Sequence, residues 1–586
     1  MTHPREPLIV PPRSTAPPST TLSEEAIRAG FSAIYTNTFA KRKPHSVFRR
    51  GASSKLPSTP AEKAAPLHVS AQVAPMDVPG LIDRLAGGIG SPRERWDYAY
   101  NLTFYPPTPP ANRSSHDWSP PCPAIDANKL HECGVAMPAP GPGTFNNVPF
   151  SVYESKSGGR RRFILWTRFA NSLCDAMGYK AYVPGLQHVS AFLPSALDEC
   201  GSGRDFKTGF YQIPIPEDAR RMFRFCDSEG RWWELTRLPM GHCCSVELMQ
   251  TLGAAAAGHP SYVKEEFKVR NVKCDLWVDN IRFTGDRSSV REATELLDRT
   301  ASAHGITWKP EDTFNELREY DFVGIAFDHV RQRVAPSAKV LDKLRALDLS
   351  DVTAGALEAL VGRLIHASAI TRVYTGSFYT ALKWARRVVN GMNSGRIMVT
   401  ARVIIPPSIR KQLSRWIEVV QVPTQVRPPI LDTAYTVFVD ASLEGWGGVI
   451  VNRHTGLISV SGARFEGRYK GGHINELEAE ALARVIQELP ADAAGGRVHV
   501  VVDNTTVRHV ALKGVCTANQ MINDSVLCAL MRLREMKCAV SLQWLRSAYN
   551  PADIPSRVPM SAVQGSTLQK LERQVAAFLL GRPDDT

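Results

Sequence analysis

The segment "KCDLWVDNIRFTG" (residues 273–285) places two short apolar runs on either side of an acidic residue and an amide. This pattern predicts a β-hairpin with Asp279 and Asn280 at its tip. A metal site at such a tip would be expected to use two carboxylates, and here it has one. Asp275 has the same side-chain parity as Asp279, but four residues of extended chain separate them by roughly 13 Å, too far to bind one ion. The hairpin therefore predicts a site that lacks one negative charge.

A partner for this hairpin occurs about 75 residues earlier. The segment "GRDFKTGFYQIPIPEDARRMFRF" (203–225) carries Asp205 just before a turn, and the alternating Ile213 and Ile215 follow in a strand-like run. Either Asp alone is more often a turn residue than a ligand. Carboxylates on neighbouring strands, however, can hold two Mg²⁺ ions roughly 3.5–4 Å apart, which clamp the attacking and leaving oxygens of a phosphoryl transfer.

The composition favours a polyanionic partner. The chain has 586 residues, enough for three or four domains, and a formal net charge of +13. Nucleic acid is the first partner that this charge suggests, although an anionic membrane would also fit. No run of about 18 apolar residues is present, and the N-terminal segment lacks the apolar core of a signal peptide. We therefore expect no membrane partner.

The cysteines indicate a reducing compartment. The chain has 11 of them, scattered and without a C-x-x-C motif. We expect no disulfide framework, and hence an intracellular location, cytoplasmic or nuclear. Cys122, His131 and Cys133 resemble a ligand cluster, but three ligands without a fourth do not predict a zinc site.

Proline content and apolar periodicity divide the chain. Of the 42 prolines, 24 precede residue 151. A Pro/Ser-rich, basic segment buries too little apolar surface to offset its chain entropy and is expected to be disordered. We expect a multidomain α+β and α/β protein with these segments: a disordered tail (1–95), an N-terminal extension (96–150), a first α+β domain (151–330), a helical region (331–395), a connector (396–433), a second, α/β domain (434–558) and a C-terminal tail (559–586).

Three aspartates mark the second domain. Asp440 lies near the end of the first strand in "YTVFVDASLEGWGGVIV" (435–451), and Asp503 ends the apolar strand in "RVHVVVDNTT". Asp553 lies between two prolines in "NPADIPSR" (550–557), which predicts a rigid turn.

A glutamate joins them from a predicted helix. Residues 474–489 have helical periodicity, and at about 100° per residue Glu478 falls within the apolar stripe, whereas Glu476 and Glu480 point away. An unpaired carboxylate on a buried face is costly, so Glu478 needs a metal or a cation. We therefore expect Glu478 to be functional and its two neighbours to lie at the surface.

Ordered motifs in the first domain resemble those of retroelement reverse transcriptases. "KSGGRRRFILWTRFAN" (156–171) resembles the fingers, "LPMGHCCSVELMQ" (238–250) the template-gripping motif and "FVGIAFD" (322–328) the strand that follows the palm. With Asp205 and the Asp279 hairpin, the resemblance implies fingers and palm at 151–330 and a thumb at 331–395. The thumb would track duplex phosphates, a contact that weakens with salt.

The resemblance also implies roles for single residues. Asp205 and Asp279 would be the metal-binding carboxylates. Phe210 would block a ribose 2′-hydroxyl and so select deoxynucleotides. Arg162 and Lys156 would hold the incoming triphosphate, in a segment with an excess of basic residues.

The template motif is implied to act through Gly241 and Gln250, which would touch the template base and backbone. Val246 departs from the family's pattern, where a proline is usual. Lys309 in "GITWKPED" is out of step with the lysine that family members use as a general acid, so it receives no role.

Asn280 is the third departure, because the family usually has a second Asp there. A unit charge about 4 Å from an ion is worth roughly 4 kcal/mol at an effective dielectric constant near 20, and an amide oxygen can recover part of that as a neutral ligand. We therefore expect a weakened or Mn²⁺-tolerant polymerase rather than an inactive one.

The second domain resembles ribonuclease H. The order Asp440, Glu478, Asp503, Asp553 is that of its four carboxylates, which bind two Mg²⁺ ions and activate water against the RNA of an RNA–DNA hybrid. "HINELE", "VVDNTT" and "NPADIPSR" resemble in particular the ribonuclease H of DIRS-type retrotransposons. The trypanosomatid VIPER branch is one candidate within that superfamily. No histidine precedes Asp553, where some ribonucleases H carry one.

Together the two resemblances imply an RNA-directed DNA polymerase with ribonuclease H activity. Its partners would be an RNA template, a DNA primer, their hybrid and dNTPs, with any element-encoded recombinase on a separate chain. One alternative is a non-catalytic nucleic-acid-binding scaffold built from a degenerate polymerase and an RNase H-like fold. A fragment of a pararetroviral polymerase is another.

Overall fold

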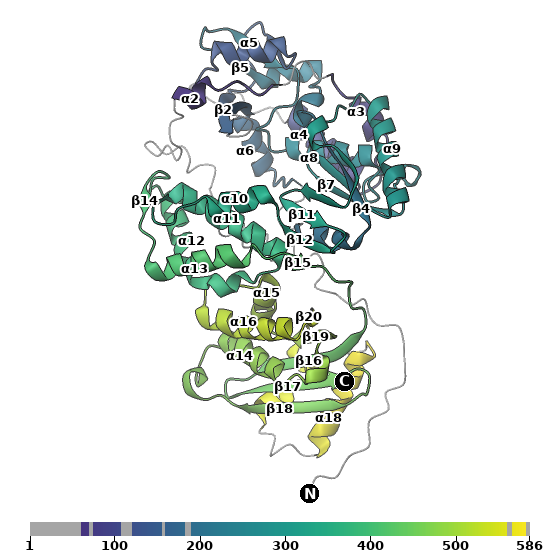
Figure 1. The fold of residues 1–586 in the computed structure, drawn as a ribbon, viewed down its shortest axis with the longest axis vertical. Coiled ribbons are helices and arrows are strands. Elements are labelled where there is room, and N and C mark those ends of the chain that lie inside the picture. The colour runs from purple at the N-terminus through teal and green to yellow at the C-terminus, as the bar shows by residue number, and fades with distance from the viewer. Residues whose placement is uncertain are drawn as a thin grey trace. The chain divides into compact units, whose positions relative to one another are not determined.

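The structure is a computed structural model that describes residues 60–69, 74–106, 120–154, 159–181, 189–558 and 565–581 (Figure 1). Chain contacts divide these residues into two compact units. The N-terminal unit comprises the described residues up to 181 and residues 195–333. The C-terminal unit comprises residues 189–194 and the described residues from 334 onward. Each unit has apolar clusters of its own.

The predicted disordered tail falls mostly outside the described residues, but its last part was placed wrongly. Met76, Leu81 and Leu85 are at most 3% exposed and belong to the core of the N-terminal unit. They are buried because α3 (Val78–Ile82) and the longer α4 (Pro92–Phe104) both pack on α8.

A four-stranded antiparallel sheet forms the centre of the N-terminal unit. Its strand order is β7-β8-β4-β9, and α8 and α9 both pack on it. In chain order these elements follow the β-α-β-β-α-β pattern of a split βαβ fold. Their bounds are β4 (Cys200–Asp205), α8 (Ser245–Ala257), β7 (Val272–Trp277), β8 (Asn280–Gly285), α9 (Arg287–Ala303) and β9 (Phe314–Leu317).

The hairpin predicted from residues 273–285 is confirmed. β7 and β8 are antiparallel, and the last pair of their register is Trp277 with Asn280. Asn280 therefore begins β8, and the turn consists of Val278 and Asp279. Val278 has a φ of 59°, a region in which a β-branched residue is strained. Its amide donates a hydrogen bond of 2.6 Å to the Gln250 side-chain oxygen on α8, which holds the strained turn.

Smaller elements surround this sheet in the N-terminal unit. β2 and β3 form an antiparallel pair, β6 lies between β1 and β5, and β10 pairs with β11. Their bounds are α2 (Pro60–Ala64), α5 (Ala124–Glu132), β1 (Ala136–Pro138), β2 (Val148–Glu154), β3 (Arg160–Trp166), α6 (Arg168–Ala176), η6 (Gly209–Gln212), η7 (Glu217–Phe223), β5 (Arg224–Cys226), β6 (Trp232–Leu235), η8 (Glu265–Phe267), η9 (Pro310–Asp312), β10 (Glu319–Phe322) and β11 (Ile325–Asp328).

Helices dominate the first half of the C-terminal unit. The segment predicted as a connector contributes α13, and its Trp416 is fully buried. The Trp416 indole donates a hydrogen bond of 2.7 Å to Ser368 Oγ and stacks on the Phe378 ring with the ring centroids 4.8 Å apart. This segment is therefore part of the helical core. The elements are α7 (Val189–Phe192), β12 (Arg333–Pro336), α10 (Ala338–Arg345), β13 (Val352–Thr353), α11 (Ala354–Thr371), η10 (Thr375–Phe378), α12 (Tyr379–Asn393), β14 (Arg402–Val403), α13 (Pro407–Val419) and β15 (Thr424–Gln425).

A five-stranded mixed sheet forms the second half of this unit. Its order is β18-β17-β16-β19-β20, with β17 antiparallel to both β16 and β18, and with β19 parallel to both β16 and β20. Alternate residues of β16 face opposite sides, so that Val437 and Val439 pack with α14 and α16, and Phe438 packs with α18. The elements are β16 (Thr433–Ala441), β17 (Gly445–Asn452), β18 (Ile458–Arg464), α14 (Ile474–Gln487), β19 (Arg497–Val502), α15 (Thr505–Lys513), α16 (Gln520–Glu535), β20 (Ala539–Trp544), α17 (Asp553–Arg557) and α18 (Gly565–Leu579).

The predicted C-terminal tail contains a helix that covers the sheet. Leu571 and Val575 of α18 are buried, and Phe578 meets Phe438 edge-on with the ring centroids 4.9 Å apart. α18 thus covers the face of the sheet that lies opposite α14 and α16.

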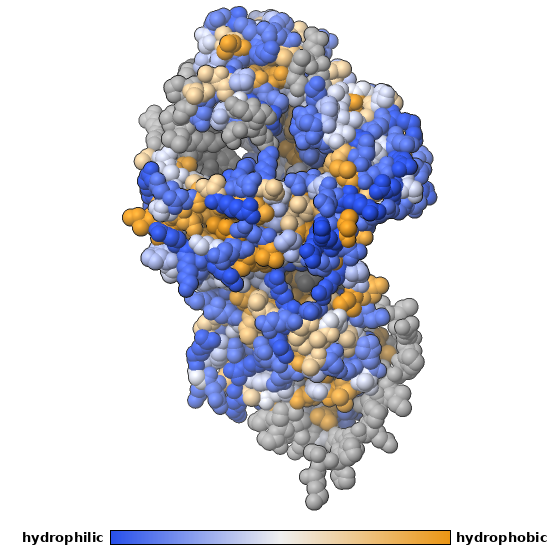
Figure 2. Space-filling view, in the orientation of Figure 1, coloured by the Kyte–Doolittle hydropathy of each residue, from blue (hydrophilic) through white to orange (hydrophobic). Residues whose placement is uncertain are grey.

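In the described part of the chain, no helix is both long and apolar enough to cross a membrane. The face shown in Figure 2 is mainly hydrophilic, with apolar residues in separate patches.

Candidate active sites

Asp205 and Asp279 come together in the N-terminal unit. β4 ends at Asp205, which pairs across the sheet with Asn280, the residue after Asp279. The backbone amide of Phe206 donates a hydrogen bond of 3.0 Å to the Asp279 carbonyl. The two aspartates meet because β4 and β8 are neighbours in the sheet.

Both carboxyl groups resist ionisation. Burial, followed by the negative charge of Asp279, raises the pKa of Asp205 to about 7. Burial also raises the pKa of Asp279, although a hydrogen bond from Asn280 lowers it. Two buried like charges are costly, and a divalent cation between them would remove that cost. By donor type and by charge, the pair fits Mg²⁺ or Mn²⁺.

The Asn280 side chain forms a hydrogen bond with the neighbouring Asp279. Its amide nitrogen donates a hydrogen bond of 3.1 Å to Asp279 Oδ1. This bond stabilises the ionised form of Asp279 and thereby compensates in part for the missing charge. This bond uses the amide nitrogen, so the expected role of the amide oxygen as a neutral ligand stays a prediction.

Lys309, assigned no role from the sequence, lies beside Asp205. Its Nζ lies 4.0 Å from Asp205 Oδ2 and 3.8 Å from Glu311, and it also pairs with Asp312. The backbone amide of Lys309 donates a hydrogen bond of 2.8 Å to the Asp205 carbonyl, which fixes this loop beside β4. The spacing of "GITWKPED" does not predict this contact, because only the tertiary fold brings the lysine close to the Asp205 carboxylate.

Gln250 and Gly241 occupy structurally demanding positions. Gln250 is 3% exposed, and its side-chain oxygen accepts a hydrogen bond from the Val278 amide, so it holds the tip of the β7–β8 hairpin. Gly241 has a φ of 128°, and a Cβ there would collide with the Leu165 carbonyl, so this position requires glycine. Their template contacts stay predictions.

The predicted nucleotide-binding residues lie around the same sheet. Arg162 Nη2 is 3.1 Å from Glu154 Oε1, and the Arg162 charge is among the influences that lower the pKa of Asp279. Phe210 is half-buried and follows Gly209, where a Cβ would stand 3.3 Å from the Asp279 Cβ. The charge of Arg162 thus acts on Asp279, and Phe210 belongs to the segment whose Gly209 lies beside Asp279. Lys156 lies outside the described residues.

A denser carboxylate cluster occurs in the C-terminal unit. One ligand atom each from Asp440, Glu478 and Asp503 lie within 4.8 Å of one another. Asp440 is 2% exposed and Glu478 is 6% exposed. The prediction that Glu478 faces the interior is confirmed.

Asp553, the first residue of α17, acts on the cluster electrostatically, but it is not one of the three residues whose ligand atoms lie within 4.8 Å of one another. Its charge is among those that raise the pKa of both Asp440 and Glu478, and its Oδ1 pairs with Arg557 Nη2 at 2.7 Å. Asn550, fully buried, donates a hydrogen bond of 2.9 Å to the Val439 carbonyl and so fixes the turn that precedes Asp553.

Ser556 positions this helix against β16, and Gly447 lets it approach β17. Ser556 Oγ donates a hydrogen bond of 2.5 Å to Asp440 Oδ2. A Cβ on Gly447 would lie 2.5 Å from the Ala552 carbonyl and from the Ser556 amide nitrogen, so only glycine lets α17 approach so closely. Neither residue was identified from the sequence.

The neighbours of Glu478 are not simply exposed, which corrects the sequence interpretation. Glu476 is half-buried and accepts a hydrogen bond of 2.6 Å from Asn519, and Glu480 bonds to Ser525 and pairs with Arg484. They lie away from the cluster, as predicted, but α16 and its preceding loop cover that side of α14.

The electrostatics of the cluster fit a divalent cation. Burial, followed by Asp503, raises the pKa of Asp440 to about 8. Burial, followed by Asp503 and Asp440, raises the pKa of Glu478 to about 10. Asp503 Oδ1 is buried and has no hydrogen-bond partner. An oxygen without a partner beside three other carboxylates is the donor set that Mg²⁺ prefers.

Comparisons with known proteins give a broad structural likeness. No family model and no curated protein matches the sequence. Similar solved structures include the foamy viral protease-reverse transcriptase dRH in complex with double-stranded DNA, at 14% identity, a TM-score of 0.44 and coverage of 81% of this chain and 83% of that chain.

Two further structures are the foamy viral protease-reverse transcriptase in complex with an RNA/DNA hybrid and with double-stranded DNA. Both are 14% identical, with TM-scores of 0.43 and 0.42. They are covered over 62% and 99% of their lengths, and cover 79% and 82% of this chain. Because TM-scores below 0.5 are too low to transfer a role, we base the function of this chain on its own side chains.

Proposed function

We propose that this chain is an RNA-directed DNA polymerase with ribonuclease H activity. The observation that carries the proposal is the convergence of Asp440, Glu478 and Asp503 within 4.8 Å, in the order expected from the motifs. The Asp205–Asp279 pair on a separate sheet supports a second site of the same chemistry.

The polymerase site would be built on β4 and the β7–β8 hairpin. Asp205 and Asp279 would hold two Mg²⁺ ions, with Mn²⁺ as a substitute, and these ions would neutralise the attacking and leaving oxygens of nucleotide transfer. Arg162 would bind the triphosphate, and Phe210 would exclude a ribose 2′-hydroxyl. Gln250 would keep the strained turn in position through Val278.

The nuclease site would act on the RNA strand of the hybrid. Asp440, Glu478, Asp503 and Asp553 would hold the same kind of ion pair. Ser556 fixes the carboxylate of Asp440, and Arg557 fixes that of Asp553. A carboxylate that is already oriented loses less conformational entropy when the scissile phosphate arrives.

For the origin of the chain, we favour a retrotransposon of the DIRS superfamily. The motifs "HINELE", "VVDNTT" and "NPADIPSR" support this branch, and each now has a local structural role: the first carries Glu478, the second ends a core strand at Asp503, and the third forms the turn into α17. dNTPs, an RNA template and a DNA primer would be its substrates, and a recombinase would be a separate chain.

The test is a pair of assays on the full chain. In the presence of Mg²⁺, we expect extension of a DNA primer on an RNA template, with dNTPs preferred over rNTPs, and cleavage of the RNA in a labelled hybrid. Asp440→Asn should abolish cleavage, and Glu488→Gln, a change at an exposed residue just after α14, should not.

The scaffold alternative gives the opposite result. If the purified chain binds the hybrid but neither cleaves it nor extends a primer with Mg²⁺ or Mn²⁺, the enzymatic proposal is wrong. Asn280 is the observation that favours this alternative, because it removes a charge from one site. The intact carboxylate cluster around Asp440 opposes it.

A further inference from the structure

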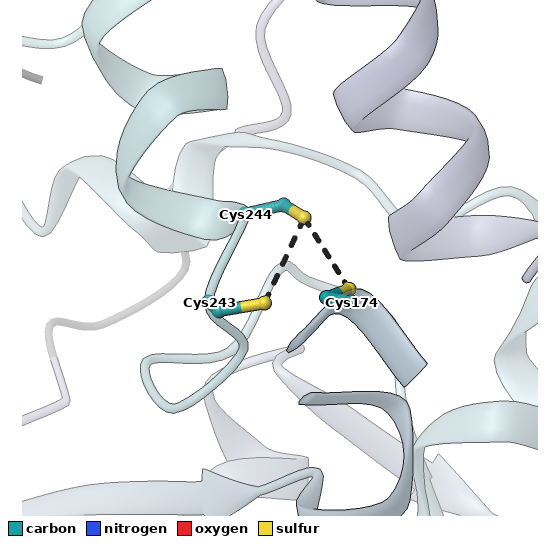
Figure 3. Close-up of side chains that lie close together, drawn as sticks. All are labelled: Cys174, Cys243 and Cys244. Atoms are coloured by element: carbon teal, nitrogen blue, oxygen red, sulfur yellow. Dashed lines mark hydrogen bonds between the residues drawn. The ribbon is translucent and has the colours of Figure 1, made fainter. Parts of the chain in front are cut away.

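Cys174 meets the consecutive Cys243 and Cys244, 70 residues further along the chain, in the N-terminal unit (Figure 3). Cys174 Sγ is 3.9 Å from Cys244 Sγ, which is 3.9 Å from Cys243 Sγ. All three sulfurs lie within 4.8 Å of one another. Cys174 and Cys244 are at most 1% exposed, and Cys243 is half-buried, so one edge of the cluster faces outward.

The fold holds these thiols in place through two elements. Cys174 lies near the end of α6, and the other two precede α8. Asn171 of α6 joins the segments, because its amide donates a hydrogen bond of 2.8 Å to the Gly241 carbonyl and accepts one of 2.8 Å from the Cys243 amide. The cluster is therefore preformed and does not depend on a long flexible loop.

The local charges suit thiolates. Cys244 caps the N-terminus of the 13-residue α8, where the free backbone amides favour negative charge. Glu247, the nearest acid of α8, is occupied by Arg95 at 2.6 Å and by Tyr179 at 2.5 Å, so it does not compete for the space among the sulfurs.

The spacing matches that of a thiophilic metal ion. Ligands at the Zn–S distance of about 2.3 Å stand roughly 3.8–4.0 Å apart around a tetrahedral or trigonal ion. Two of the observed separations are 3.9 Å. A disulfide would instead need the sulfurs to approach to about 2.05 Å.

We propose that Cys174, Cys243 and Cys244 bind one Zn²⁺ ion, with solvent at the half-buried edge as the fourth ligand. Each thiol releases its proton to water as it becomes a ligand, so binding frees up to three protons, and no electron is transferred. The ion would tie α6 to the loop that carries Gly241. This site is separate from both carboxylate clusters and does not depend on the proposed enzymatic function.

The experiment measures the metal content and its ligands in the full chain. We expect about one Zn²⁺ per chain by mass spectrometry after exchange into metal-free buffer with a phosphine reductant. With Co²⁺ in place of Zn²⁺, an intense near-ultraviolet band from sulfur to cobalt should appear, which carboxylate ligands do not produce. Hydrogen exchange in the Gly241 loop should slow when Zn²⁺ is added.

Matched variants identify the ligands. Cys243→Ser is the most informative variant, because this half-buried position tolerates a polar substitution. It should lose the cobalt band and at least about tenfold in Zn²⁺ affinity, whereas Cys226→Ser, at a half-buried cysteine in the same unit but outside the cluster, should retain both. Double variants that combine Cys243→Ser with Cys174→Ser or with Cys244→Ser should bind no Zn²⁺.

Three outcomes would overturn the proposal. The first is wild-type protein that takes up neither Zn²⁺ nor Co²⁺ while its thiols are reduced. The second is a cobalt band that persists in Cys243→Ser. The third is a mass two hydrogens lower in wild type, absent from Cys174→Ser, which would show that the cluster is a disulfide pair. Because the first outcome is measured on wild-type protein alone, it does not depend on a variant that folds.

Discussion

The side chain at position 280 sets the charge of the proposed polymerase site. Asn280 donates a hydrogen bond to Asp279 and supplies no negative charge. We expect Asn280→Asp to raise primer extension at limiting Mg²⁺ by about tenfold, because even a third of the roughly 4 kcal/mol for a unit charge at 4 Å amounts to that factor. Steady-state extension kinetics would measure it.

Asn271→Asp is the matched control for this change. It adds the same charge just before β7, away from the hairpin tip, and should leave the rate unchanged. Equal extension rates for wild type and Asn280→Asp would contradict the prediction. They would show that a carboxylate at position 280 contributes no more to metal binding than the amide does.

Protonation of Asp440 and Glu478 makes the stability of the second sheet depend on pH. Their pKa values are raised to about 8 and about 10, well above the values near 4 of an unfolded chain, so the folded, metal-free state holds protons that the unfolded state has released. This stabilisation is complete below about pH 4 and is lost as the pH rises through the folded pKa values, by up to about 1.4 kcal/mol per pH unit for each protonated group.

Hydrogen exchange of peptides from β16 and β19 in the presence of a chelator would measure this effect. Between pH 5 and 8, after correction for intrinsic exchange rates, protection should fall with rising pH. Mg²⁺ should restore it, and Asp440→Asn should flatten the dependence. Protection that increases with pH in the metal-free protein would contradict the assigned protonation.

The approach of α17 to β17 is decided by backbone rather than by side-chain chemistry. In Gly447→Ala the new methyl group would collide with backbone atoms of Ala552 and Ser556, which cannot move aside as a flexible side chain would. We expect a destabilisation of about 1–3 kcal/mol and loss of hybrid cleavage, because Asp553 is displaced. Chemical denaturation and the cleavage assay would measure both effects.

Gly362→Ala is a suitable control for that substitution. Gly362 lies within α11, and nothing stands within 4 Å of an added Cβ. Alanine there should stabilise the helix by about 0.5–1 kcal/mol and leave cleavage unchanged. If both variants behave alike, close packing of α17 does not explain the glycine.

Across the whole molecule, the two carboxylate sites belong to different compact units with separate apolar cores. We therefore expect their activities to be separable. Asp205→Asn should reduce primer extension by at least about a hundredfold and leave hybrid cleavage near the wild-type rate, and Asp440→Asn should do the reverse. Parallel assays on one preparation would measure both rates; loss of both activities from a single substitution would show that the sites depend on each other.

The sequence alone determined the elements whose signal is local. The alternation around Asp279 predicted the hairpin, and the helical apolar stripe at 474–489 placed Glu478 on the buried face of its helix. Both signals are local, because strand and helix periodicities depend on residues that are near one another in the sequence. It also identified the carboxylates that meet in each unit, through the order of their motifs. The packing of α13 and α18 was not predicted, because the sequence does not show which surfaces their apolar faces cover.

Only the tertiary structure decided which side chains meet. Lys309 reaches Asp205, Ser556 fixes Asp440, and Cys174 meets the Cys243–Cys244 pair, although the partners in each contact are far apart in the chain. Such contacts follow from which strands are neighbours in a sheet and how closely two backbones approach. Those are properties of the folded whole, because one local pattern is compatible with many sheet orders, and close packing then selects the order that leaves no collision at residues such as Gly447.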